Sequence, residues 1–233
     1  MTDIAPGALA ALARWDTPTV CNALEIVVPE RRATGFTVQH LHCLDPSLPP
    51  MVGYARTVTY RSVHPAALDA AQARERRAEY YEYVATPPGP TVAVVQDLDP
   101  LPGYGAMWGE VNTAVHKGLG CLGAVTNGSI RDLPDCAPGF QLLAGKVGPS
   151  HAHGHVVDFA GQVNVFGMNV RHGDIIHADR HGAVVIPAHA VAAIPAAVEL
   201  LVRREAVILE AARKPGFNIE ILKRAMADSA EIH

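Results

Sequence analysis

Hydrophobic and polar positions divide the first half of the chain into strand-like and helix-like segments. Residues 52–60 alternate in polarity and are rich in β-forming side chains, which predicts a strand. Residues 65–84 are rich in Ala, Arg and Glu, and this composition favours a helix. After the proline-rich break at 87–90, the apolar run Thr91–Val95 is typical of a strand buried on both faces.

The following segment predicts a parallel crossover. Glu110–Lys117 has a helical pattern that Gly118 can close, and Leu122–Thr126 is a second buried apolar run. Asn127–Gly128 then predicts a turn. A strand, a loop, a helix and a strand within residues 91–126 are typical of one βαβ unit.

The two ends of the chain predict helices, and the segment before the C-terminal ones predicts short strands. Residues 6–26 favour a helix that breaks near Pro18, where Asp16 or Thr17 can cap the second piece. Short strands separated by glycine turns are expected at 162–170, 174–178 and 183–186, and helices at 188–212 and 217–228. We therefore expect a single mixed α/β domain over residues 1–233, with N-terminal helices at 1–26 and C-terminal helices at 188–233 packing on it.

Composition and charge narrow the class of protein. The 233 residues are 49% hydrophobic and 18% charged, which is typical of a globular chain with a substantial core. The net charge of −4 and the lack of a basic stripe argue against nucleic-acid binding. We expect no signal peptide and no membrane span, and hence a cytoplasmic location. The 4 cysteines form no CxxC pair, which argues against a thiolate zinc site.

The first candidate site is the glycine-bearing loop 105–112. It lies between a predicted strand and a predicted helix, and a helix N-terminus presents unpaired backbone N–H groups to a carboxylate or phosphate. Gly109 would permit a ligand to approach the backbone closely. An ordinary turn between a strand and a helix explains the same residues.

The second candidate site is the segment 127–132, which follows the next predicted strand. Ligands of open α/β sheets bind beyond the carboxyl ends of strands, so this segment and the glycine loop point to one place. Arg131 offers a planar fork for a carboxylate, and Asp132 offers a hard oxygen ligand for Mg²⁺ or Mn²⁺. A surface pair of arginine and aspartate is the alternative.

Histidines supply a third candidate. His151, His153 and His155 are spaced by two, which would place them on one face of a strand as a ladder of metal ligands. A loop edge with exposed histidines fits the spacing equally well. The later group 179–182 has the composition of an ordinary turn. A serine-hydrolase elbow, a His-Glu-x-x-His motif and a dinucleotide-binding fingerprint do not occur in the sequence.

Two segments carry a family resemblance. Gly109–Asn112 and Gly118–Asp132, with their spacing, resemble the core signature of the RraA-like family. Asp16–Leu24 resembles the opening helix of that family, and Gly53–Val58 its early strand. Gly173–Pro187 resembles its closing β-section, so that the likeness extends over about residues 8–212.

The resemblance implies a fold, an assembly and a range of activities. The family fold is an α/β/α core with a β-barrel-like central sheet, and its members assemble as trimers or hexamers. The family includes 4-hydroxy-4-methyl-2-oxoglutarate aldolases, oxaloacetate decarboxylases, proteins formerly labelled demethylmenaquinone methyltransferases, and an inhibitor of ribonuclease E. The implied activity is a divalent-metal-dependent lyase that releases pyruvate; the alternative is a non-catalytic regulator that binds a ribonuclease.

The resemblance also implies roles for individual residues. Gly109 and the backbone amides of Val111 and Asn112 would hold the carboxylate of a 2-oxo acid, and Arg131 would bind the same substrate and stabilise developing negative charge. Asp132 would bind Mg²⁺ or Mn²⁺, and Glu110 would contribute to catalysis by holding metal-bound water. No lysine lies in these motifs, so a Schiff-base aldolase is disfavoured.

Overall fold

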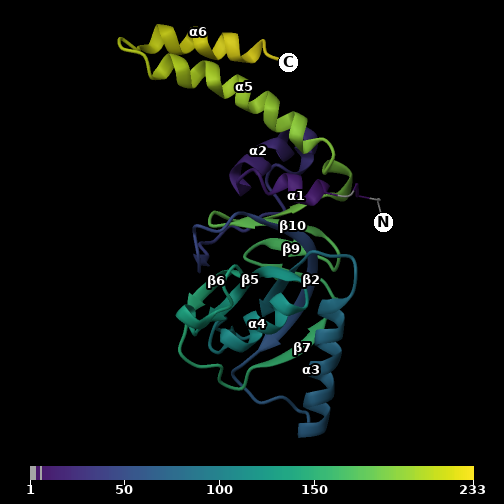
Figure 1. The fold of residues 1–233 in the computed structure, drawn as a ribbon. Coiled ribbons are helices and arrows are strands. Elements are labelled where there is room, and N and C mark those ends of the chain that lie inside the picture. The colour runs from purple at the N-terminus through teal and green to yellow at the C-terminus, as the bar shows by residue number, and fades with distance from the viewer. Residues whose placement is uncertain (1–3, 6) are drawn as a thin grey trace.

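Most of the predicted elements are present in the fold, a computed structural model that describes residues 4–5 and 7–233 (Figure 1). The region 1–26 is expected to form N-terminal helices. Its residues 1–3 and 6 lie outside the described part of the chain. The helices are α1 Ala8–Leu12, α2 Thr17–Val27, α3 Ala70–Ala85, α4 Glu110–Gly118, α5 Ile194–Ala212 and α6 Ile219–Ala230, with 3₁₀ turns η1 Pro29–Arg31, η2 Leu133–Asp135 and η3 Ala188–Ala190. The strands are β1 His42–Cys43, β2 Met51–Arg61, β3 Thr91–Asp97, β4 Ala106–Trp108, β5 Cys121–Ile130, β6 Gln141–Val147, β7 His155–Phe159, β8 Val163–Val165, β9 Met168–Val170, β10 Ile175–Asp179 and β11 Gly182–Ile186.

A curled, nine-stranded sheet forms the centre, as the expected barrel-like α/β fold requires. Its strand order is β1-β6-β5-β3-β2-β10-β11, with β4 beside β5 and β7 beside β2. The middle strands β6, β5, β3 and β2 are parallel to one another. The predicted crossover β3–α4–β5 is therefore confirmed, and β2–α3–β3 is a second one. The sheet curls into a half-barrel that helices flank.

The central strands are buried on both faces, which explains their continuous apolar runs. Along β3, Val92 and Val94 pack into the concave core with the β8–β9 hairpin, whereas Ala93 and Val95 pack outward toward α3 and α4. Successive residues of a strand point to opposite faces of the sheet. Where both faces are buried, both sets of positions are apolar, and the polar-apolar alternation of a half-exposed strand is lost. Val125 of β5 belongs to the concave cluster in the same way.

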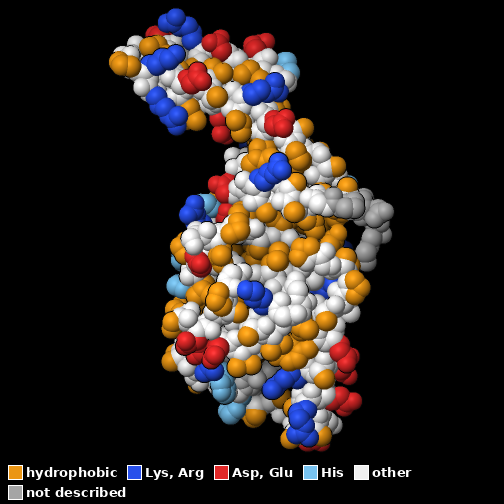
Figure 2. Space-filling view, viewed as in Figure 1, with side chains coloured by type: hydrophobic (Ala, Val, Ile, Leu, Met, Phe, Trp, Pro, Cys, Tyr) orange, Lys and Arg blue, Asp and Glu red, His pale blue; other side chains and the backbone are white. Residues whose placement is uncertain are grey.

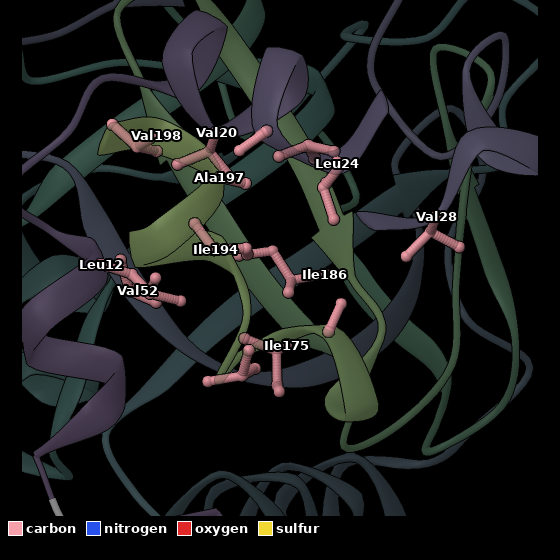
Figure 3. Packing of buried hydrophobic residues seen from close by; sticks show 14 of the residues in the cluster. Leu12, Val20, Leu24, Val28, Val52, Ile175, Ile186, Ile194, Ala197 and Val198 are labelled. Carbon is pink, nitrogen blue, oxygen red and sulfur yellow. The ribbon is translucent and has the colours of Figure 1, made fainter. Parts of the chain in front are cut away.

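The N-terminal helices and the start of α5 close one end of the sheet. Asp16 caps α2 by accepting a hydrogen bond from the N–H of Thr19, and Pro18 occupies its first turn, as the sequence predicted. Figure 3 shows Leu24, Ile186 and Ile194 converging from α2, β11 and α5 in one buried cluster. The tight packing of such aliphatic side chains is what holds these three elements together.

Beyond this cluster the C-terminal chain leaves the body. Figure 1 shows α5 and α6 as an antiparallel hairpin that projects from the sheet domain. Its two helices contact each other, for example where the Ser229 hydroxyl donates to the Arg204 carbonyl at 2.9 Å. Figure 2 shows charged and hydrophobic side chains mixed over the hairpin, and Val202, Ile219 and Met226 are more than half exposed. None of the helices described in residues 4–5 and 7–233 is long and apolar enough to cross a membrane.

Three predicted elements differ from the structure. The helix expected over 65–84 begins at Ala70, because Asp69 and Gln72 form a capping box there. The strand expected over 162–170 is the hairpin β8–β9, which turns at Phe166 and Gly167 with positive φ angles.

The turn expected at Asn127–Gly128 lies inside β5 instead. The side chain of Asn127 accepts from the N–H of Asp97 at 2.7 Å and donates to the Asp97 carbonyl at 3.0 Å. A side-chain amide thus takes the place of a backbone partner, and β5 continues to Ile130 with one extra residue relative to β6 between Thr126 and Ser129.

A buried histidine joins α4 to α3. His116 Nδ1 lies 2.6 Å from the Asn112 carbonyl oxygen, which can only accept, so Nδ1 carries the proton. Nε2 therefore accepts from the Tyr80 hydroxyl at 2.7 Å. Burial lowers the pKa of His116 from its ordinary 6.5 to about 4.

This arrangement predicts a pH dependence of stability. The unfolded chain binds a proton at His116 below about pH 6.5 and the folded chain does not, so the free energy of unfolding falls as pH drops from 6.5 toward 4. We expect this histidine to account for about 3 kcal/mol of that loss. Urea unfolding of His116→Gln at several pH values should show a shallower pH slope, whereas the exposed control His189→Gln should keep the full slope. Equal slopes for His116→Gln and the unaltered chain would contradict the prediction.

Candidate active site

The two predicted motifs meet at one edge of the sheet. β4 and β5 run parallel, with Ala106 opposite Ser129 and Trp108 opposite Ile130. The N–H of Arg131 continues the pairing by donating to the Trp108 carbonyl at 2.9 Å. Since both strands end here, the start of α4 and the residues that follow β5 lie side by side.

Gly109 lies directly beneath the arginine–aspartate pair. A Cβ atom added to Gly109 would lie 2.5 Å from Asp132 Oδ2 and 3.2 Å from Arg131 Cγ. These distances are shorter than van der Waals contact, so the absence of a side chain at this position lets the two segments approach. Arg131 Nε in turn lies 3.3 Å from Asp132 Oδ2, and both side chains are about one-third exposed.

The first turn of α4 offers backbone donors at this place. Gly109 is the residue before the helix, and no side chain caps it. Within the described chain, no group accepts a hydrogen bond from the N–H of Val111 or Asn112. Unpaired N–H groups and the positive end of the helix dipole favour an anion.

The side chain of Asn112 is committed elsewhere, which fixes its backbone. Its Oδ1 accepts from the Tyr81 hydroxyl at 2.9 Å, and its Nδ2 donates to the carbonyl of Met107. These bonds tie the first turn of α4 to α3 and to β4. The rigid turn therefore presents its N–H groups in a fixed direction.

A cavity of about 620 Å³ lies over these groups and has the size of a small-ligand site. Gly109, Val111, Asn112, Arg131 and Asp132 all contribute to its wall. The predicted residues are thus brought together, apart from Glu110, which is exposed and does not border the cavity. Glu110 instead lies near the thiol of Cys136. The pKa of that thiol is raised mainly by burial and further by the negative charges of Asp132, Asp135 and Glu110.

The histidine segment also reaches the cavity, but as a loop. His151 and His153 precede β7, which begins at His155, so the three do not share one face of a strand, and the segment is the loop edge that the spacing equally allowed. Nδ1 of His151 and of His155 each bond a nearby backbone carbonyl. Among residues 4–5 and 7–233, no group of three or more His, Cys, Asp or Glu side chains is placed to hold a metal ion.

Buried carboxylates hold the loop that leads into β4. Asp97 Oδ2 accepts from the N–H of Gly103 at 2.7 Å, and Asp99 Oδ2 accepts from the hydroxyl and the N–H of Ser62, each at 2.7 Å. The Ser62 hydroxyl also accepts from the N–H of Gly105. Burial raises the pKa of Asp97 above its ordinary value. The segment 97–100 thus supports the site.

The other polar group singled out in the sequence is structural. Asp179 ends β10 at the turn into β11, where its Oδ1 accepts from the N–H of His181 at 2.8 Å. Its Oδ2 accepts from the N–H of Thr17 at 2.9 Å and so fixes the start of α2. The turn predicted for 179–182 is confirmed.

Fold and site together define an α/β protein in which a helix N-terminus faces an arginine–aspartate pair beyond neighbouring parallel strands. Residues 17–185 match the family model described as RraA-like, Aldolase/RraA. The chain belongs to the RraA-like family, as its motifs indicated. None of the curated proteins compared with the chain matches it.

Solved structures share the fold. An uncharacterized protein from Pseudomonas syringae pv. tomato str. DC3000 is 22% identical with a TM-score of 0.71, and the match covers 97% of this chain and 96% of that chain. RraAS2 from Streptomyces coelicolor, described as an unusual member of the RNase ES inhibitor RraA protein family, is also 22% identical, with a TM-score of 0.68 and coverage of 92% of this chain and 100% of that chain. At this identity the likeness establishes the architecture.

The close packing over Gly109 predicts a sharp effect of a single methyl group. Gly109→Ala should displace Arg131 and Asp132 and weaken binding of oxalate, a small planar anion, by at least about tenfold. Isothermal titration in the presence of Mg²⁺ measures this. The matched control is Gly118→Ala at the other end of α4, where an added Cβ meets nothing within 4 Å. Equal oxalate affinities for the two variants would show that the contact over Gly109 does not shape the site.

Proposed function

We propose that this protein is a divalent-metal-dependent lyase that cleaves the C–C bond next to a 2-oxo acid and releases pyruvate. The observation that supports the proposal is the meeting of Arg131, Asp132 and the free N–H groups of α4 over Gly109 in one cavity. Candidate reactions are the retro-aldol cleavage of 4-hydroxy-4-methyl-2-oxoglutarate and the decarboxylation of oxaloacetate. Both leave the same three-carbon enolate.

Substrate binding follows from the donors at the site. The N–H groups of Val111 and Asn112 would take the carboxylate of the 2-oxo acid, at the positive end of the α4 dipole. Arg131, which borders the same cavity, would then reach the neighbouring 2-oxo oxygen. The two contacts would orient the substrate so that its C3–C4 bond is the one that breaks.

Bond cleavage creates a negative charge that the site must stabilise. When the C3–C4 bond breaks, its electron pair moves into the C2–C3 bond and charge develops on the 2-oxo oxygen. In decarboxylation the C4 carboxylate leaves as CO₂, and in the retro-aldol the 4-hydroxyl group passes its proton to water as the second pyruvate forms. In both reactions a proton from water then adds to C3 of the enolate and gives pyruvate. The guanidinium of Arg131 is fixed beside that oxygen and lowers the barrier because the charge is greater in the transition state than in the substrate.

The residues present fit a magnesium-type ion. The carboxylate of Asp132 borders the cavity, and only its Oδ2 contacts Arg131. Carboxylate oxygen is the ligand type that Mg²⁺ and Mn²⁺ prefer. Mg²⁺ is commonly held by one or two carboxylates and keeps several waters, so a single first ligand suits it. Asp132 would hold the ion, and Glu110, which does not border the cavity, would act on the ion only through bound water. The ion would supply Lewis-acid stabilisation of the developing charge.

Assembly into a trimer or hexamer belongs to the same proposal. The α5–α6 hairpin projects from the body, and its exposed Val202, Ile219 and Met226 offer apolar surface for a neighbouring subunit. The resemblance to the family favours sites near such subunit contacts.

A direct assay tests the reaction. The purified chain with Mg²⁺ or Mn²⁺ should release pyruvate from oxaloacetate or from 4-hydroxy-4-methyl-2-oxoglutarate, and EDTA should abolish the release, because the metal stabilises the enolate. Pyruvate is measured with coupled lactate dehydrogenase. Release that EDTA leaves unchanged would contradict the metal mechanism. No release from either substrate would favour the alternative, a regulator of a ribonuclease, as in the RNase ES inhibitor RraA protein family to which RraAS2 belongs.

A pair of arginine variants tests the location of the site. Arg131→Ala should lower kcat/KM by about 100-fold or more, since it removes a charged donor to the transition state. The matched control is Arg180→Ala, an exposed arginine at the β10–β11 turn that bonds the Pro46 carbonyl. Its kcat/KM should stay within about twofold of the unaltered chain. Equal losses in the two variants would move the active site away from Arg131.

A further inference from the structure

A tyrosine that the motifs do not include also faces the cavity. Tyr60 lies near the end of β2, opposite Asp97 of β3 and Val156 of β7, and its side chain is 5% exposed. It lines the same cavity as Gly109 and Arg131. The register between β2 and β7 shifts between Thr59 and Tyr60, and such an irregularity commonly re-aims a side chain beside a functional site.

The hydroxyl of Tyr60 is closely surrounded and yet unpaired. Within the described chain, no residue forms a hydrogen bond with it, whereas the hydroxyls of the neighbouring tyrosines Tyr80, Tyr81 and Tyr83 each have a partner. A Cβ atom added to Gly154 would overlap the Tyr60 hydroxyl oxygen, so the loop that carries the histidines passes directly over it. The N–H of Gly154 bonds the His151 carbonyl, and the N–H of His153 bonds the Ser62 carbonyl, which fixes that loop. The fully buried side-chain polar atoms without a partner in the described chain belong to Arg56, Thr91, Trp108 and Ser129, so the Tyr60 hydroxyl is still open to the cavity, where a ligand can pair with it.

The charges around Tyr60 make it a donor. Burial, together with the carboxylates of Asp97 and Asp99, raises the pKa of Tyr60 above its ordinary range, and nearby Arg131 opposes this. The hydroxyl therefore keeps its proton at neutral pH. Tyr60 and Arg131 border one cavity, so an anionic ligand that the guanidinium binds there can also meet the Tyr60 hydroxyl.

We propose that Tyr60 is a further catalytic residue, whose hydroxyl donates a hydrogen bond to the substrate oxygen that Arg131 holds. The inference rests on the proposed lyase function, because that oxygen is the one on which charge develops. Tyr60 and Arg131 then form a two-donor oxyanion site built from β2 and from the end of β5. No proton is transferred: the hydroxyl donates the same hydrogen bond before and after the C–C bond breaks, more strongly once the oxygen is negative.

Substitution of the hydroxyl tests this role. Tyr60→Phe should weaken oxalate binding by about tenfold in the presence of Mg²⁺, because oxalate carries the two adjacent oxygens of a pyruvate enolate. It should lower kcat for pyruvate release by a similar factor with a smaller change in KM, since the bond strengthens in the transition state. The matched control is Tyr54→Phe, on the same strand but away from the cavity, which should leave both values within about twofold.

A double-mutant cycle separates this role from a structural one. Gly154→Ala should lower oxalate affinity by pushing against the Tyr60 hydroxyl. Once Tyr60→Phe has removed that oxygen, the added methyl group should cost less, and the remaining cost comes from the ring carbon Cζ and the His151 carbonyl oxygen, each 2.9 Å from the added Cβ. Additive effects of the two substitutions, or an oxalate affinity that Tyr60→Phe leaves unchanged, would overturn the proposal. Thermal melting of each variant identifies a loss due to misfolding.

The outcomes also distinguish this proposal from the lyase function. Oxalate binding that depends on the Tyr60 hydroxyl, without pyruvate release from either substrate, would keep the Tyr60 contact and overturn the lyase. Pyruvate release with equal kcat and equal oxalate affinity in Tyr60→Phe would keep the lyase and overturn the Tyr60 contact. If the unaltered chain neither bound oxalate nor released pyruvate, both would be overturned.

Discussion

The approach of two backbones at Gly109 is the contact on which the site depends. Parallel pairing of β4 with β5 ends at Trp108 and Ile130. The next residues along the chain are Gly109 after β4 and Arg131 after β5, and these two belong to the site. Because Gly109 has no Cβ, the carboxylate of Asp132 can lie against the start of α4. Backbone donors, a guanidinium and a carboxylate therefore share one small volume without any long side chain reaching across the cavity.

Hydrogen bonds of polar side chains fix the segments on either side of Gly109. Asp97 and Asp99 fix the loop before β4, while the paired side chain of Asn112 fixes the first turn of α4. The neutral ring of His116 joins that helix to α3 through Tyr80. Each support is a polar side chain held by hydrogen bonds, and such groups favour one geometry because alternatives leave a donor or an acceptor unpaired. The site is thereby held ready for a ligand.

Local patterns were sufficient for the sheet order of the central unit and for the residues of the motifs. Buried strands, the crossover at 91–126 and the cap at Asp16 each follow from a few neighbouring residues, and the structure has them. Features that depend on distant partners could not be predicted in this way. The strand through Asn127 exists because its amide pairs with Asp97 thirty positions earlier, and Tyr60 meets Gly154 only through the pairing of β2 with β7.

The extra residue in β5 sets the register in which the end of the strand meets its two neighbours. Between Thr126 and Ser129 the strand advances three residues while β6 advances two, from Ala144 to Lys146. Beyond this surplus, Ile130 pairs with Trp108 of β4 on one side and with Val147 of β6 on the other. Ile130 is buried, and the next residue, Arg131, borders the cavity. Because side chains alternate along a strand, an arginine placed one position out of step with β4 would start from the opposite face of the sheet.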